Sequence, residues 1–232
     1  MRGEPGVRPR IFRAGIPAAN ILRQMASPPL TLTLTRELFH PKAFNLMASP
    51  SHKPVILTIG HSTHPLEAFI QLLQAHGVTR VADVRTVPRS RHNPQFNRET
   101  LPEQLKLAGI GYVHLPGLGG LRHARSDSPN RGWHNASFRG YADYMQTPEF
   151  AENLKALMRL AQEDRLALMC AEAVPWRCHR SLIADALSLR GVQVEHILGL
   201  KGRQPHRLTG FARVKGLEIT YPEEEARDTK EG

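Results

Sequence analysis

The chain has 232 residues, of which 41% are hydrophobic and 22% charged, proportions typical of a globular domain rather than a disordered or fibrous chain. No run approaches the roughly 18 consecutive apolar residues of a membrane-spanning helix, and no secretory signal is recognisable at the start. Two cysteines cannot make a disulfide framework, so we expect a reducing, cytoplasmic setting and no membrane partner.

Residues 1–52, rich in Arg and Pro, are predicted to be a disordered extension. Residues 1–46 hold seven of the 31 Lys and Arg residues but only two of the 21 Asp and Glu residues, so they account for half of the net charge of +10. Three origins are open: a gene start placed upstream of a true start at Met47, a basic interaction tail, or an organellar transit peptide. The remaining positive charge is compatible with phosphate-bearing ligands or nucleic acid, and it decides nothing alone.

From residue 53 to 200 the sequence predicts a regular alternation of strands and helices. Apolar strands are predicted at 55–59, 81–84, 112–115, 166–170 and 192–197. Helices are predicted between Pro65 and Gly77, between Thr100 and Gly109, over 141–145, from Thr147 to 161, and from 182 to Gly191. Thr100 with Glu103 is predicted to form a capping box, and Thr147 to cap the fourth helix.

This alternation predicts a single α/β domain of three layers, with about five mainly parallel strands and helices on both faces of the sheet. Residues 116–138 are too long for an ordinary turn and are predicted to be a functional loop. Residues 201–232 are predicted to be a tail that is first basic and then acidic.

Polar side chains follow the strands at the carboxyl edge of the predicted sheet, where ligands bind in open parallel sheets. The turns at the other edge are ordinary helix stops, so the sequence predicts one crevice. Its candidate residues, in chain order, are His61, Ser62, Asp83, Arg85, Arg89, His114, Gly119, Gly120, Cys170, Glu172, Cys178, His179, Arg180 and His196.

The turn from the fourth strand into the last helix contains the largest number of chemically reactive side chains. Cys178 at the helix start, beside His179 and Arg180, is predicted to be a nucleophile with a depressed pKa, or else a semi-buried structural cysteine. Arg180 and His179 are predicted to contact a bound anion. Glu172 is predicted to be a general acid or base, with a role as the ion-pair partner of Arg180 as the alternative.

The other strand ends supply predicted ligand contacts. His61 is a candidate base and Ser62 a hydroxyl for a phosphate, while Arg85 and Arg89 are candidate anion clamps that have surface salt bridges as their alternative. Asp83 is predicted to orient Arg85. The remaining candidates have weaker signals: a phosphate loop at Gly119 and Gly120, and supporting or core positions for His114, His196 and Cys170.

Three further types of site fit the sequence poorly. A phosphatase-like loop needs five residues between its Cys and Arg, whereas six separate Cys170 from Arg177. A structural zinc site prefers shorter Cys spacings, so no metal site is predicted, although His61, His64 and His114 leave a site across the strands open. A dinucleotide fingerprint is missing from the first turn, so the cofactor is unknown.

From residue 55 to about 198 the chain resembles the family known as domain of unknown function 488 (DUF488). The resemblance is carried by Thr58-Ile59-Gly60-His61-Ser62, Asp83-Val84-Arg85 with Pro88 and Ser90, the segment from Tyr112 to Gly120, Phe138 with Tyr141, Met169-Cys170-Ala171-Glu172, Cys178-His179-Arg180, and His196-Ile197. The family has no established activity, so the resemblance supports the fold and the choice of site residues.

The sequence therefore predicts an enzyme, a hydrolase or group transferase, that acts on a small phosphorylated or nucleotide-like ligand. Its catalytic residues are predicted to be Cys178, Glu172 and His61. The alternative is a non-catalytic module that binds nucleic acid or nucleotides through the same site and the basic residues of 201–215.

Overall fold

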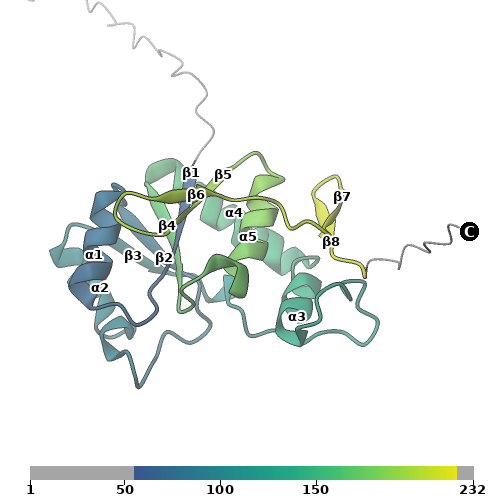
Figure 1. Ribbon diagram of the computed structural model, residues 1–232, viewed down its shortest axis with the longest axis horizontal. Helices are drawn as coiled ribbons and strands as arrows, with labels where there is room; N and C mark the ends of the chain where they lie inside the picture. Colours follow the sequence, from purple (N-terminus) through teal and green to yellow (C-terminus); the bar gives the residue numbers. More distant parts are fainter. Residues whose placement is uncertain (1–54, 224–232) are drawn as a thin grey trace, which may run out of the picture. The chain divides into compact units, whose positions relative to one another are not determined.

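The computed structural model describes residues 55–223, and Figure 1 shows a central sheet with helices on both sides. The sheet has the strand order β3-β2-β4-β1-β5-β6, in which the first five are parallel and β6 runs antiparallel to β5. The strands are β1 (Val55–Gly60), β2 (Arg80–Asp83), β3 (Gly111–His114), β4 (Leu166–Cys170), β5 (Gln193–Ile197) and β6 (Arg203–Pro205). The predicted α/β class is confirmed, whereas the predicted extension over 1–52 lies outside the described residues.

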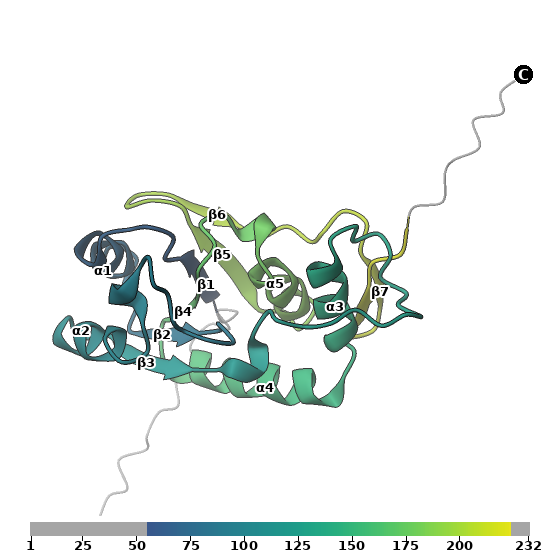
Figure 2. The same ribbon diagram turned by 90° about the horizontal axis from the view of Figure 1, so that it is seen from below.

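Helices cover the two faces of the sheet unequally (Figure 2). One face carries α1 (Leu66–Ala75) and α2 (Leu101–Leu107), and the other carries α3 (Ala136–Tyr144), α4 (Pro148–Glu163) and α5 (Arg180–Ser188). Successive strand residues point to opposite faces, so Leu57 packs in the core under α1 and α2, and Ile56 in the core under α4 and α5. None of the helices within 55–223 is long and apolar enough to cross a bilayer.

The helix ends agree with the sequence in some places and differ in others. Thr147 caps α4 as predicted, with its hydroxyl accepting the backbone N–H of Phe150 at 3.2 Å. The predicted capping box at Thr100 is wrong, because its backbone is helical (φ −108°, ψ −49°) rather than extended as a capping side chain requires. Helix α3 begins before the predicted 141, because the Asn135 side chain accepts the N–H of Ser137 at 2.8 Å and starts the helix there.

The domain continues past residue 200, where the sequence predicts a tail. Strand β6 extends the sheet, and β7 (Arg213–Lys215) pairs with β8 (Glu218–Thr220) in a hairpin. Tyr221 is completely buried, and its hydroxyl donates to Asp185 of α5 at 2.8 Å. The segment up to Tyr221 is therefore held on the domain by buried polar contacts, which leave no periodic apolar pattern in the sequence.

Candidate active site

The candidate site lies at the carboxyl ends of β1, β2 and β4, where the chain changes from one face of the sheet to the other. The connections after β1 and β2 run through α1 and α2, whereas the connection after the adjacent β4 runs through α5 on the opposite face. Adjacent strands whose connections leave in opposite directions open a crevice at their carboxyl ends. Gly60 ends β1 beside this crevice, and a Cβ there would collide with the Glu172 carbonyl and lie 2.9 Å from Arg180 Nη2.

A cavity of about 330 Å³ opens in this crevice. Its polar floor is formed by Cys170 at the end of β4 and by Cys178 and His179 at the start of α5. Its walls come from the loop after β2, from the 116–138 loop and from α3, and they include Val87, Leu121 and Phe138. The predicted functional loop thus contributes directly to the cavity, through Gly120 and Leu121.

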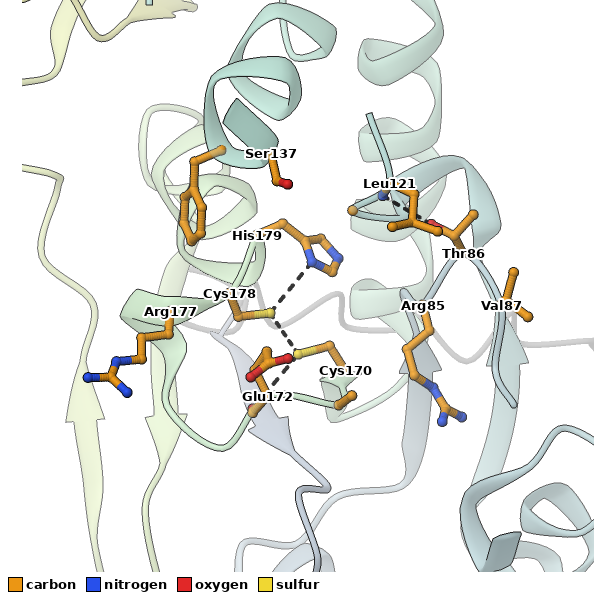
Figure 3. Close-up of a pocket in the computed structure, with 13 residues that line it drawn as sticks. Arg85, Thr86, Val87, Leu121, Ser137, Cys170, Glu172, Arg177, Cys178 and His179 are labelled. Carbon is orange, nitrogen blue, oxygen red and sulfur yellow. Dashed lines mark hydrogen bonds between the residues drawn. The ribbon is translucent and has the colours of Figure 1, made fainter. Parts of the chain in front are cut away.

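Two thiols meet on the floor of the cavity. The Sγ atoms of Cys170 and Cys178 are 2.7 Å apart, and both cysteines are free (Figure 3). Arg180 contacts both sulfurs: its Nε donates to Cys170 Sγ at 2.9 Å and its backbone N–H to Cys178 Sγ at 3.5 Å. The two thiols therefore share one hydrogen-bonded cluster with a guanidinium.

The His179 ring completes this cluster. Its Nε2 lies 3.1 Å from the Val84 carbonyl oxygen, which can only accept, so Nε2 carries the hydrogen. The unprotonated Nδ1 then faces Cys178 Sγ at 3.5 Å and can take the thiol proton. A Cβ on Gly120 would lie 2.6 Å from Nδ1, so only glycine leaves the ring in this position.

Arg180 is a buried cation, 1% exposed. Its other donors reach neutral oxygens, with Nη1 bonded to Thr58 Oγ1 at 3.2 Å and Nη2 to the Glu172 carbonyl at 2.7 Å. Within residues 55–223, no carboxylate lies within salt-bridge distance of its guanidinium. Since a buried charge without a counter-charge is costly, a thiolate in the cluster is the natural partner of this cation.

These contacts shift the pKa values of the two thiols in opposite directions. Burial alone raises the pKa of the Cys178 thiol, but the hydrogen bonds with Cys170 and His179 and the charges of His179 and Arg180 outweigh it, so the pKa lies well below its ordinary value. For Cys170, burial and the hydrogen bond to Cys178 raise the pKa well above its ordinary value. These directions favour Cys178 as the thiolate and Cys170 as the thiol that donates to it.

A family model described as "Domain of unknown function DUF488" matches residues 65–187, which include β2, β4 and the start of α5. The chain belongs to the DUF488 family. A search of curated proteins and a search of solved structures each found no significant match. The family match gives no function, so the chemistry has to be derived from the site itself.

Asp83 and Arg85 of this DUF488 chain form a buried ion pair beside the cavity. Arg85 donates to the Asp83 carboxylate through Nε at 2.9 Å and Nη2 at 2.6 Å, and Tyr112 donates its hydroxyl to the same carboxylate at 2.8 Å. Arg85 lines the cavity, but its charge is already neutralised by Asp83. These two hydrogen bonds hold the Arg85 guanidinium against Asp83 at the wall of the cavity.

His61 lies behind this ion pair and does not border the cavity. Its Nε2 accepts from Arg85 Nη1 at 3.1 Å, its Nδ1 donates to the Ser62 carbonyl at 2.9 Å, and its ring stacks on Phe96 at 4.2 Å. Both nitrogens of the predicted base are therefore engaged within the protein. Ser62 also stays outside the cavity lining, with its backbone in the left-handed region (φ 46°).

The buried His61 makes the stability of the DUF488 domain depend on pH. Burial, reinforced by the charge of Arg85, lowers the pKa of His61 from 6.5 to about 4. Between these values the unfolded chain binds a proton that the folded chain does not. We expect this histidine to reduce the free energy of unfolding by on the order of 1 kcal/mol per pH unit as the pH falls from about 6.5 towards 4.

Urea denaturation at several pH values measures this effect. His61→Gln, which cannot titrate, should give a shallower decrease than the natural chain, whereas His134→Gln, at an exposed position, should leave the slope unchanged. Equal slopes for the natural chain and His61→Gln would contradict the assignment.

The remaining predicted residues divide between the rim of the cavity and positions outside it. Glu172 lines the cavity with an exposed side chain, and Arg180 bonds to its backbone carbonyl rather than to its carboxylate, so the predicted alternative ion pair is absent. Gly120 lines the cavity, whereas Gly119 packs beside Thr86 just outside it. Arg89 is exposed and does not line the cavity.

A buried chain of hydrogen bonds leads away from Arg180, and most of it was not predicted from the sequence. Arg180 donates to Thr58, whose hydroxyl can in turn donate to His196 Nδ1 at 2.8 Å. His196 Nε2 then faces His206 Nδ1 at 3.1 Å, and His206 Nε2 faces Asp185 Oδ1 at 2.7 Å. The signal that could have found it is Asp185, a single acid within the apolar pattern of the last helix.

Metal ligation was left open from the sequence for His61, His64 and His114. Two of these rings are hydrogen-bonded to backbone carbonyls. His61 Nδ1 donates to the Ser62 carbonyl, and His114 Nε2 donates to the Arg85 carbonyl at 2.8 Å. In the part of the chain that the structure describes, no group of three or more His, Cys, Asp and Glu side chains is placed to hold a metal ion.

Proposed function

We propose that this DUF488 protein is an enzyme, a hydrolase or group transferase, that uses the Cys178 thiolate as its nucleophile. The observation that carries the proposal is the contact of Cys178 Sγ with Nδ1 of His179 on the floor of an open cavity. A cysteine paired with a histidine is a general arrangement for covalent catalysis, because the ring removes the thiol proton and holds it for a leaving group.

The reaction would proceed in two steps. The Cys178 thiolate attacks an electrophilic carbon, phosphorus or sulfur atom of the ligand, and the bond from that atom to its leaving group breaks. The leaving group takes the proton held at His179 Nδ1. Water or a second acceptor then cleaves the bond to sulfur, and the exposed Glu172 carboxylate at the rim is available to take the proton from that acceptor.

The cavity favours a ligand with an apolar or planar body and an anionic group. Val87 and Leu121 are 62% and 75% exposed, so the walls offer apolar surface to a ligand. Arg177 stands at the rim with its guanidinium directed away from the sulfurs (Figure 3), and the amino-terminal end of α5 adds positive potential. A phosphorylated or nucleotide-like compound has both properties.

The first test concerns the thiol itself. We expect the rate of alkylation of Cys178 by iodoacetamide to reach half its maximum at a pH well below the ordinary value of about 8.5, because His179, Cys170 and Arg180 stabilise the thiolate. Mass mapping of the modified peptide identifies the residue, and Cys178→Ser is the blank. A half-maximal rate near pH 8.5 would contradict the assignment of Cys178 as the nucleophile.

The second test concerns the ligand. Thermal unfolding of the full chain with nucleotides, sugar phosphates or inorganic phosphate should reveal a ligand as a gain of about 2.7 kcal/mol at a hundredfold its dissociation constant. Arg177→Gln should weaken an anionic ligand, and Cys178→Ala should keep binding but lose turnover. Turnover that survives in Cys178→Ala would contradict the mechanism.

A second candidate function is a non-catalytic module for nucleic acid. It is favoured by five basic side chains that are all exposed: Lys201, Arg203, Arg207, Arg213 and Lys215. Phe211, the aromatic residue of this segment, packs on Trp133 and Tyr221, so it does not offer a face for base stacking. Binding of an oligonucleotide that falls steeply with salt, without turnover of any small ligand, would favour this function.

A further inference from the structure

The mechanism proposed above uses Cys170 only as a hydrogen-bond donor to the Cys178 thiolate. Its sulfur lies 2.7 Å from Cys178 Sγ, borders the same cavity and accepts a hydrogen bond from Arg180 Nε at 2.9 Å. The two cysteines stand at the two ends of the loop 171–177, and neither is in a disulfide. No rearrangement of the fold is needed to bring the sulfurs together.

We propose that Cys170 is the resolving thiol of a redox-active pair, and that the protein exchanges disulfides with small anionic thiol compounds. The proposal rests on the proposed function in one respect, namely that Cys178 is the nucleophile. It goes beyond that function by naming a redox reaction, in which one half of the substrate disulfide is held briefly on Cys178 and both halves leave as thiols. The carboxylates of such a compound would meet Arg177 at the rim.

The exchange balances in two steps. The Cys178 thiolate attacks one sulfur of a disulfide RS–SR, the S–S bond breaks, and the departing RS⁻ takes the proton held by His179. Cys170 then attacks Cys178 Sγ, the mixed disulfide breaks, and the second RS⁻ takes the proton lost by Cys170. The substrate gains two electrons and two protons, the protein dithiol becomes a disulfide, and an external dithiol reduces it for the next turn.

Arg180 assists the second step. Its guanidinium touches Cys170 Sγ directly, so it stabilises the negative charge that develops there when Cys170 attacks. The finished disulfide carries no charge and would leave the buried Arg180 without a counter-charge. The dithiol form is therefore favoured over the disulfide, which makes the disulfide easy to reduce and suits it to repeated exchange.

The experiment follows the fully reduced full chain after addition of glutathione disulfide, with intact mass and released glutathione as the readouts. The natural chain should pass through a glutathione adduct and end with an internal disulfide, a loss of two hydrogens, and two glutathiones released per protein. Cys170→Ser should stop at the adduct on Cys178 with one glutathione released. Cys178→Ser should react no faster than an unactivated thiol.

The outcomes separate this proposal from the proposed function. If Cys178 forms the adduct but the natural chain and Cys170→Ser behave alike, the resolving role is overturned while the nucleophile stands. If Cys178 does not react in either chain, both the resolving role of Cys170 and the nucleophilic role of Cys178 are refuted. Should Cys170→Ser fail to fold, peptide mapping of the natural chain decides alone, since a peptide pair linked through Cys170 and Cys178 is required and its absence refutes the pair.

Discussion

Replacing Arg180 with methionine is expected to raise the pKa of the Cys178 thiol, because it removes a nearby positive charge that favours the thiolate. The thiolate fraction at pH 7 would then fall about tenfold for each rise of one in the pKa, and the rate of alkylation would fall with it. The structural reason is that the guanidinium contacts Cys170 Sγ, which lies 2.7 Å from Cys178 Sγ, and has no carboxylate partner among residues 55–223. The backbone N–H of residue 180, which reaches Cys178 Sγ, is kept in the variant. The pH profile of iodoacetamide alkylation measures the shift.

The same substitution should lower the free energy of unfolding by about 3–5 kcal/mol, the usual cost of removing one member of a buried ion pair. Thr58 Oγ1 and the Glu172 carbonyl would each lose a donor as well. Arg180→Lys keeps a charge but cannot make the forked contacts, so its alkylation profile should lie between the natural chain and Arg180→Met.

Arg190→Met is the matched control for Arg180→Met. It removes a guanidinium just past the other end of α5, where Nη1 donates to the Ala186 carbonyl at 2.8 Å far along the helix from the thiols. It should leave the alkylation profile of Cys178 unchanged. An Arg180→Met protein that is folded and alkylated at the natural pH midpoint would show that the thiolate does not depend on the buried cation.

The sequence predicts the sheet well because its strands are almost continuously apolar. A strand such as β4, buried along its whole length, has this signature whichever face each residue meets. Strand β6 has no such signature: Arg203 to Pro205 is polar and exposed, and it pairs only because β5 offers a free edge. Pairing at an edge depends on the neighbour and cannot be read from the strand itself.

The candidate site is predicted in part for a similar reason. The order of strands and turns brings Cys178, His179 and Arg180 to the carboxyl edge of the sheet, and this order can be read from the sequence. The partner of each charged side chain, however, cannot be read from the sequence. Arg85 forms an ion pair with Asp83. The Glu172 carboxylate stays exposed, and it is the Glu172 backbone carbonyl that accepts a hydrogen bond from Arg180. Such pairings depend on distances across strands that spacing along the chain does not encode.

Replacing Asp185 with alanine is expected to lower the free energy of unfolding by about 3–5 kcal/mol, because several buried donors lose their acceptor and each costs about 1–3 kcal/mol. The carboxylate is completely buried on α5 and accepts from His206 Nε2 at 2.7 Å, Thr209 Oγ1 at 2.7 Å and the Tyr221 hydroxyl at 2.8 Å. Urea denaturation measures the loss.

This prediction also has a local readout, because the four donors to Asp185, which include the backbone N–H of Thr209, all come from the segment after β5. Loss of the carboxylate should therefore loosen residues 203–221 before the sheet unfolds, and limited proteolysis should cut there first. Asp127→Ala is the control, since Asp127 pairs with Arg125 on the surface, where solvent screens the pair and its contribution to stability is small. If Asp185→Ala unfolds like the control and its 203–221 segment stays resistant to protease, Asp185 is not the anchor of this segment. If the segment loosens, the hydrogen bonds from His196 through His206 lose their end point, and the buried chain that begins at Arg180 connects the thiol site to the stability of the carboxyl-terminal segment.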